Sequence, residues 1–328
     1  MNGLRAIASS LVLLLALAAN AEPNPRGVWM MDTVDDTGLE PDPATAAQDM
    51  WKSPSIWIRN ADDGGLIHQN PVYGQTNYVY VKLRREVVEG KEPIEGELEL
   101  YYANASTGLD WKSQWTLIDK LPVSILNESE LIVKFPWDPA GKGHFCLVAR
   151  WSSPEDQPHD ETTNIDSNTR LNNNVVWRNL NVIDLHKSLE SFSTIIVRNV
   201  DEGIRGINLA FRVPRMENAR PFVGKQGRVV IRLDEQLFRR WEEMGAMGDG
   251  FERVGDFELE VVNPENAMLF GIPMKLGEEF PVEIRFERFE WAEPGVFHFD
   301  AVQLQKDGKE TGGVGYEIRT VEEPQQLK

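Results

Sequence analysis

Cysteine and histidine are scarce in this chain of 328 residues, which contains one cysteine, Cys146, and five histidines. A single thiol cannot form an intramolecular disulfide, so packing must stabilise the fold in any compartment. The ten tryptophans supply large apolar surfaces for that packing. The apolar fraction of 41% is typical of a globular chain rather than a disordered one.

The common catalytic signatures are also missing. The sequence contains no Gly-x-Ser-x-Gly elbow, no His-Glu-x-x-His and no phosphate-binding loop. Its main glycine cluster, Gly245 to Gly250, follows an expected helix, whereas a dinucleotide site places such a cluster between a strand and the next helix. The sequence thus gives no positive indication of an enzyme.

Basic residues are outnumbered by acidic ones, 34 against 52, and the formal net charge is −18. A field of this sign repels nucleic acid and anionic membrane surfaces, so we expect no nucleic-acid partner. Calcium or a basic partner suits such a charge better.

At ~100–200 residues per domain, a chain of this length predicts two domains, each with its own core.

Only one long apolar run is present, from Leu11 to Ala18. It follows Arg5 and precedes Ala19-Asn20-Ala21, the small-x-small pattern that signal peptidase cleaves. The run is too short to span a membrane. We therefore expect a secretory signal peptide over residues 1–21, cleaved after Ala21. The mature protein is then expected in the periplasm or outside a bacterial cell, without a membrane span.

Alternation of apolar and polar residues over short segments occupies most of the remaining chain. Such alternation is typical of antiparallel strands with one buried and one solvated face. A first series lies within residues 50–185 and a second within residues 190–328. Seven or eight strands per ~140 residues predict an all-β fold of two immunoglobulin-like antiparallel β-sandwiches in tandem. The clearest segments are 79–83, 98–102, 131–135, 145–151, 175–183, 207–213, 229–233, 257–261, 280–286, 297–301 and 314–318.

Departures from this alternation lead to three further predictions. Residues 22–49, rich in Pro, Asp, Thr and Ala, predict an acidic extended leader. A change of parity between Trp177 and Leu180 indicates a bulge in the last strand of the first domain. One short helix is expected in the second domain, capped by Asp234 and ended by Gly245, with an apolar face of Leu237, Trp241 and Met244.

Several stretches of the first domain resemble a known module. They are Asp36 to Pro41, Met50 to Asn60, His68 to Val81, Gly143 to Leu147 and Asn172 to Asn174. Over residues 36–184 they resemble an immunoglobulin-like module of bacterial secreted and surface proteins, akin to the cell-adhesion-related (CARDB-like) domains. The resemblance implies an accessory or interaction role and supplies no catalytic residues. The second domain resembles this module only in its general plan of strands.

His144 and Cys146 form one candidate reactive pair. Two residues apart on one strand, they point to the same face, close enough to share a metal or to pair a thiolate with an imidazole. The opposite face, with Phe145, Leu147 and Trp151, is wholly apolar and is expected to be the core. The alternative is that both residues are inert because the leader or the second domain covers them.

Asn164, Asp166 and Asn168 place oxygen ligands at alternate positions, as a calcium loop does. The sixth position, which needs glycine, is Thr169, and the twelfth, which needs a carboxylate, is Val175. Asparagine also serves turns through local hydrogen bonds. Calcium and a simple turn are therefore the two interpretations of this loop, and no other cofactor is expected.

Trp111 and Trp115 flank a polar loop. If they are exposed at the end of the sandwich, their planar apolar rings can stack on sugar rings. In the alternative, they plug the open end of the sandwich, where an indole nitrogen can reach a backbone carbonyl.

These observations favour an exported, non-catalytic protein that mediates adhesion, binding or assembly at the bacterial cell surface, with a protein or polysaccharide partner. One alternative is a carbohydrate-binding module that uses Trp111 and Trp115. Another is an enzyme or metal-dependent accessory protein, with Cys146 or the acidic loop over residues 156–174 as its reactive centre.

Overall fold

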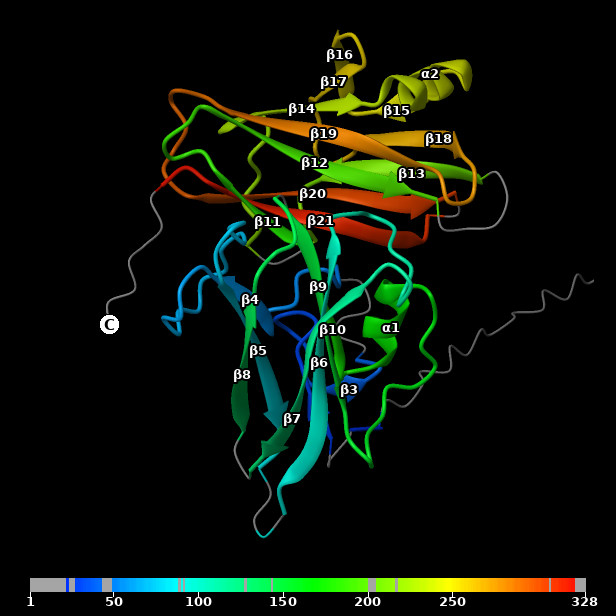
Figure 1. Ribbon diagram of the computed structural model, residues 1–328. Coiled ribbons are helices and arrows are strands. Elements are labelled where there is room, and N and C mark those ends of the chain that lie inside the picture. The colour runs from blue at the N-terminus through cyan, green and yellow to red at the C-terminus, as the bar shows by residue number, and fades with distance from the viewer. Residues whose placement is uncertain are drawn as a thin grey trace, which may run out of the picture.

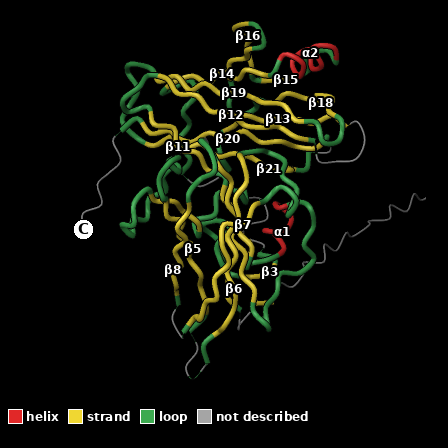
Figure 2. Tube along the Cα trace, in the orientation of Figure 1, coloured by secondary structure: helices red, strands yellow, loops and turns green. Residues whose placement is uncertain are grey.

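The computed structural model describes residues 22–23, 27–42, 49–87, 90, 92–126, 129–142, 144–199, 205–215, 218–306 and 308–321. The signal peptide expected over residues 1–21 lies outside them. The described chain is all-β and forms two β-sandwiches, one above the other in Figure 1. Figure 2 shows how far strands outweigh the two helices. None of the helices in this part of the chain is long and apolar enough to cross a membrane.

The first sandwich packs a four-stranded sheet against a sheet centred on β5. The strand order of the first sheet is β10 (Val175–Arg178), β9 (Phe145–Ser152), β6 (Ile94–Asn104) and β7 (Thr116–Ile125). In the second sheet β5 (Asn77–Arg85) pairs with β8 (Glu130–Trp137) along one edge, and with β4 (Ile56–Arg59) and β2 (Val28–Trp29) along the other. The alternating apolar residues of both sheets meet between them as a buried core.

Residues 27–42 belong to this sandwich, so the prediction of an extended leader is wrong for them. Val28 and Met30 are fully buried in the core, and β2 pairs with β5. Farther along, β3 (Leu39–Glu40) pairs with β1 (Glu22–Pro23). The carboxylate of Asp36 is buried and accepts hydrogen bonds from the backbone of Asp32 and Gly38. Strands of two residues are too short to show a period of two in the sequence.

The second sandwich contains a six-stranded and a five-stranded sheet. The strand order of the six-stranded sheet is β11 (Leu180–Asp184), β21 (Glu310–Arg319), β20 (Val296–Gln305), β13 (Arg205–Arg212), β18 (Met268–Met274) and β15 (Gly248–Asp249). That of the five-stranded sheet is β12 (Glu190–Arg198), β19 (Glu279–Arg288), β14 (Gly227–Leu233), β17 (Glu258–Val261) and β16 (Phe251–Gly255). Aromatic side chains, including Phe286, Phe299 and Tyr316, fill the space between the sheets.

Both helices are short. The predicted helix in the second domain is confirmed as α2 (Glu235–Glu243), with Asp234 accepting hydrogen bonds from the backbone nitrogens of Gln236 and Leu237. Met244 follows the helix and is 51% exposed, so its place on the apolar face was wrong. A second helix, α1 (Ile165–Leu171), was not predicted because seven residues give too little periodicity to separate a helix from a turn.

The chain changes sheets at Asn179. The sequence predicted one bulged strand over 175–183 and a domain boundary between residues 185 and 190, but β10 ends at Arg178 in the first sandwich and β11 pairs in parallel with β21 of the second. Asn179 spans the gap, since its N–H donates to Trp51 O (2.7 Å) and its carbonyl accepts from Gly315 N (2.9 Å). The change of parity therefore marks the point where the chain leaves one sheet for another. The predicted bulge and the predicted domain boundary are both wrong, because the boundary lies at Asn179.

An apolar cluster joins the two sandwiches. From the first sandwich it includes Trp51, Cys146 and Trp177, and from the second Ala210 and Val302. Strand β9 is consequently buried on both faces. Two ion pairs cross the same junction, between Lys52 and Asp300 (2.5 Å) and between Arg212 and Asp49 (3.0 Å). The side chain of Asp300 is fully buried, so this junction is packed as a protein interior is.

Candidate functional site at the edge of strand β12

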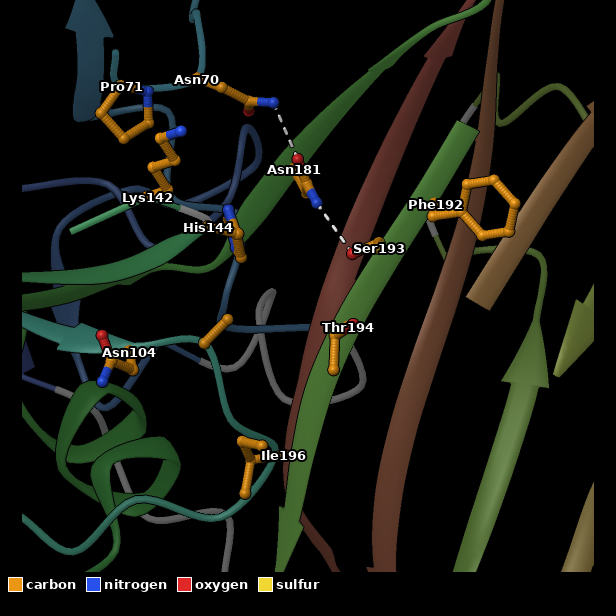
Figure 3. A pocket seen from close by; sticks show the side chains of 11 residues that line it. Asn70, Pro71, Asn104, Lys142, His144, Asn181, Phe192, Ser193, Thr194 and Ile196 are labelled. Carbon is orange, nitrogen blue, oxygen red and sulfur yellow. Dashed lines mark hydrogen bonds between the residues drawn. The ribbon is translucent and has the colours of Figure 1, made fainter. Parts of the chain in front are cut away.

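A cavity of about 560 Å³ opens where the two sandwiches meet (Figure 3). The second sandwich contributes Asn181 of β11 and residues 192–194 and 196 of β12. The first contributes Asn70, Pro71, Asn104 and Ala105, together with Lys142 and His144 just before β9. The cavity thus depends on how the sandwiches pack, since neither contains it alone.

The electrostatic character of the cavity differs from that of the whole chain. Its described lining residues include no aspartate or glutamate, although the chain carries 52. The charged group is the exposed Lys142. An anionic ligand is therefore repelled less here than at an average position on this acidic molecule.

His144 forms part of the wall as a neutral imidazole. Its Nε2 lies 2.6 Å from Asn179 Oδ1, and Asn179 Nδ2 donates to the carbonyls of Gly313 (2.8 Å) and Ser106 (3.3 Å). Because these carbonyls fix the amide orientation, Nε2 of His144 must carry the proton that it donates to Oδ1. Burial lowers the pKa of His144 to about 4, so the ring stays uncharged at neutral pH.

A chain of hydrogen bonds fixes the floor of the cavity. Asn70 Nδ2 donates to Asn181 Oδ1 (2.9 Å), and Asn181 Nδ2 donates to Ser193 Oγ (3.0 Å), as Figure 3 shows. Ser193 Oγ in turn lies 3.3 Å from the hydroxyl of Tyr316, whose pKa burial raises. Ser193 is therefore held by two neutral partners, and none of the described residues places a base against its hydroxyl.

The edge of β11 that faces the cavity is closed by side chains. Val182 N donates to Asn70 Oδ1 (2.9 Å), and Asn70 Nδ2 donates to Val182 O (2.7 Å). His68 lies 3.2 Å from Leu180 O through Nε2 and accepts from Ile58 N through Nδ1 (3.3 Å), so Nε2 is its donor. These side chains occupy the positions of a neighbouring strand.

The edge of β12 is closed only at its two ends. Ile196 N donates to Ala105 O (3.3 Å) and its carbonyl accepts from Thr107 N (3.0 Å), while Gln303 bonds both backbone groups of Arg198. At the other end Ser188 Oγ bonds the N–H and the carbonyl of Glu190. Pairing of β12 with β19 is regular over residues 190–198, so alternate residues point their backbone groups away from β19.

Phe192 and Thr194 have the same parity as Ile196 and line the cavity. Their N–H and carbonyl groups therefore face outward, as those of Ile196 do. Within the described part of the chain, neither residue has a hydrogen bond on that side. The structure thus contains an open stretch of strand edge inside a cavity.

Cys146 and His144 do not form a reactive pair. Cys146 is fully buried in the apolar cluster between the sandwiches, and its Sγ lies 4.0 Å from Asn104 O. Burial raises the pKa of the thiol to about 12, so it remains protonated, while His144 bonds Asn179 instead. The alternative interpretation, that the second domain covers Cys146, is confirmed.

Asn164, Asp166 and Asn168 do not converge on a cation, because they lie at the start of a helix. Asn164 caps α1 by accepting from Ser167 N (3.0 Å), and Asp166 accepts from Arg170 Nε (2.9 Å). Asn168 bonds the N–H and the carbonyl of Thr162. Across the described residues no group of three or more His, Cys, Asp and Glu could hold a metal ion. The calcium interpretation is wrong for these residues.

Trp111 and Trp115 are buried, with 7% and 8% exposure, so they offer no platform to a sugar. Their rings pack edge to face with centroids 5.9 Å apart, and Trp111 also contacts Tyr101. Trp111 Nε1 donates to Glu161 Oε1 (2.9 Å). Both residues are buried, as the plug alternative expected, but Trp111 Nε1 bonds a side-chain carboxylate and not the expected backbone carbonyl.

Sequence reasoning did not single out Asn70, Asn181 or Ser193. A signal was present for Ser193, because it occupies a core-facing position of β12, on the same face as the apolar residues Ile195 and Val197 that follow it. A polar residue in such a series needs a hydrogen-bond partner inside the fold. The sequence could not supply that partner, which comes from β11 and β21.

No family model and no curated protein matches this chain. Among solved structures, it is similar to the CARDB domain of a Pyrococcus furiosus protein in complex with di-metal ions (17% identity, 42% of this chain and 93% of that one, TM-score 0.22). It is also similar to the CupB6 tip adhesin from Pseudomonas aeruginosa (10% identity, 82% of this chain and 98% of that one, TM-score 0.22). A third similar structure is red sea bream transglutaminase (10% identity, 80% of this chain and 31% of that one, TM-score 0.24).

Proposed function

We propose that this protein is an exported, non-catalytic binding protein that holds a partner protein at the bacterial cell surface, in adhesion or assembly. The observation that carries the proposal is the cavity between the sandwiches, which contains an open strand edge. The apolar run before Ala21 supports export, and the resemblance of residues 36–184 to CARDB-like modules fits an interaction role.

The chemistry of the cavity supports binding rather than catalysis. Ser193 is bonded to Asn181 and Tyr316, so no general base activates its hydroxyl. His144 donates Nε2–H to an amide oxygen, and burial lowers its pKa well away from the value that a base working at neutral pH needs. These groups fix the wall and do not assemble a reaction centre.

The junction between the sandwiches supports a cavity of fixed shape. Trp51 and Trp177 of the first sandwich share one buried cluster with Ala210 and Val302 of the second, and Lys52 bonds the buried Asp300 of the second sandwich. Breaking such contacts to move one sandwich against the other would expose apolar surface and a buried charge. A preformed site loses little conformational entropy when it binds.

The experiment is a cell-binding assay. Residues 22–328 are purified, labelled with a fluorophore and added to cells of the source bacterium that lack the gene. We expect saturable binding that unlabelled protein displaces and that protease treatment of the cells removes. Lys82→Gln, which changes a surface ion pair with Glu130, is the matched control and should bind as the wild type does. Failure of the wild type to bind these cells would overturn the proposal.

A second candidate function, carbohydrate binding, is favoured by Trp291 rather than by Trp111 and Trp115. Trp291 is 75% exposed and stacks on Phe289, with ring centroids 4.8 Å apart and an angle of 27° between the planes. Stacked rings at a surface offer a flat apolar platform to a sugar. Affinity gels with assorted polysaccharides test this: retardation that is lost in Trp291→Ala but kept in Tyr73→Ala would support it. Unchanged mobility in every gel would refute it.

A further inference from the structure

We propose that the open edge of β12 binds an extended, neutral or acidic peptide segment of the partner protein as an added antiparallel or parallel strand. This inference rests on the proposed function, because it specifies how the partner is held. The segment would pair with the backbone of Phe192 and Thr194 and lie against Asn181 and Lys142. Main-chain pairing would supply the affinity, and the walls would supply the selectivity.

The backbone geometry supports this occupant first. An edge strand presents unpaired N–H and carbonyl groups that template the pairing of another chain. In β12 these groups belong to Phe192 and Thr194, between the ends closed at Glu190 and Ile196. From residue 190 to residue 196 a strand extends over roughly 20 Å, at about 3.3 Å per residue, which suits a segment of about five residues.

The neighbouring edge shows that the opening is specific to β12. On the same side of the second sandwich, Asn70 bonds both backbone groups of Val182, and His68 bonds Leu180 O. The first sandwich thus blocks the edge of β11 with side chains and closes β12 only at Ile196, through Ala105 and Thr107. An added strand has one place to pair in this cavity, beside residues 192–194.

The side chains around the edge indicate the kind of peptide. Phe192 is 52% exposed, and in Figure 3 its ring lies on the other side of β12 from Ser193. It is available as a cross-strand partner for an apolar or aromatic side chain of the peptide. On the inner side the walls carry the Asn181 amide and the Lys142 ammonium, with no carboxylate among the described lining residues. A neutral or acidic segment fits these walls.

The test begins with peptides of known sequence. Phage-displayed random dodecapeptides are selected on the folded protein of residues 22–328, and the enriched sequences are synthesised and measured by fluorescence anisotropy. We expect neutral or acidic sequences with alternating apolar residues. Lys142→Glu should weaken the acidic ones about tenfold. Selection that enriches no peptide, or only basic ones, would overturn the proposal.

Substitutions at Thr194 then separate strand pairing from side-chain contact. Thr194→Pro removes the outward N–H and leaves the ladder with β19 intact, because proline is tolerated where an edge N–H faces away from the sheet. Losing one backbone hydrogen bond and the close approach of the peptide should weaken binding ~10-fold or more. Thr194→Val keeps the N–H and should bind within about threefold of wild type. Equal binding by both variants would refute strand pairing.

A readout on the backbone itself guards against misfolding of the proline variant. In the wild type, the amide hydrogens of Phe192 and Thr194 should exchange quickly without peptide and slowly with it. The amide of Ile196, already bonded to Ala105 O, should change little. Peptide binding that leaves the exchange at residues 192 and 194 unchanged would refute the inference.

The cell assay distinguishes the two proposals. If Thr194→Pro binds cells as the wild type does, the inference about β12 fails and the binding function stands. If the wild type binds no cells, the proposed function fails, whatever the peptides do.

Discussion

The carboxamide of Asn70 pairs with both backbone groups of Val182, accepting from its N–H at 2.9 Å and donating to its carbonyl at 2.7 Å. One side chain of the first sandwich thus takes the place of a strand beside β11 of the second. Asn70 also donates to Asn181, so it joins the closed edge to the floor of the cavity. The contact stabilises the junction between the sandwiches. It also prevents another strand from pairing with this edge of β11.

Removal of the Asn70 carboxamide should therefore destabilise the fold. Asn70→Ala leaves Val182 N–H and carbonyl without their partner, and we expect the free energy of unfolding to fall by about 2 kcal/mol. Urea unfolding followed by tryptophan fluorescence measures the change. Gln75→Ala, which removes an exposed hydrogen bond to Asn60 O, is the control and should cost less than about 0.5 kcal/mol. Equal losses would show that the pairing with Val182 contributes nothing.

The ion pair between Lys52 and Asp300 gives a second prediction. Lys52→Met leaves the buried Asp300 carboxylate without its cation, which should cost about 3 kcal/mol at pH 8. The control is Lys82→Met, whose partner Glu130 lies at the surface, and it should cost less than about 1 kcal/mol. Urea unfolding at fixed pH compares the two, and similar losses would contradict the prediction.

The same variant should respond to pH in a defined direction. Burial raises the pKa of Asp300 to about 7 even with Lys52 present, and removing that cation raises it further. The folded state thus binds the Asp300 proton more tightly than the unfolded state does. Stability is therefore lost as pH rises from the ordinary pKa of an aspartate, 3.8, through the raised pKa of about 7. The loss caused by Lys52→Met should be smaller at pH 5 than at pH 8. A loss that does not vary with pH would show that Asp300 is not the group left unpaired.

Much of the fold could be predicted because most strands are long enough to show their period. In β5 and β6, alternate residues face one core over nine and eleven residues. The two-residue strand β2 carries no such pattern, and its Val28, together with Met30 just after it, was assigned to a leader. Strands can thus be predicted from this sequence where the alternation of apolar residues repeats several times. They cannot be predicted where, as in β2, the strand is too short for the alternation to repeat.

The cavity could not be predicted for a related reason. It depends on Asn70 reaching Asn181 and Val182, a contact between sandwiches across more than a hundred residues of chain. The change of parity at Asn179 was visible in the sequence, but a bulge and a change of sheet produce the same pattern. Buried polar residues in apolar series, such as Ser193, are the local trace that such a junction leaves.

Cys146 should be inert in the folded protein. Burial raises its pKa to about 12 and the apolar cluster covers its sulfur, so neither a thiolate nor access is present. We expect no reaction with Ellman's reagent at pH 8 under native conditions, and reaction of one thiol after denaturation in guanidinium chloride. Cys146→Ala should cost about 1–2 kcal/mol by leaving a small cavity. Rapid labelling of the native protein would contradict burial of the thiol.

His144 should make stability depend on pH in the opposite sense to Asp300. Its pKa falls from 6.5 to about 4 because burial disfavours the imidazolium, so between these values the unfolded chain binds the proton and the folded chain does not. The stability contributed by the neutral ring is therefore complete above pH 6.5 and is lost as pH falls towards 4, by up to about 3 kcal/mol.

His144→Gln keeps a donor for Asn179 and cannot titrate, so its unfolding free energy should fall less than that of wild type over this range. Gln75→Ala, which removes an exposed hydrogen bond and no titratable group, is the control and should give a curve parallel to that of wild type. Denaturant unfolding at intervals from pH 7.5 to pH 4.5 decides the matter: if the curves of wild type and His144→Gln stay parallel, the neutral imidazole does not support the wall of the cavity.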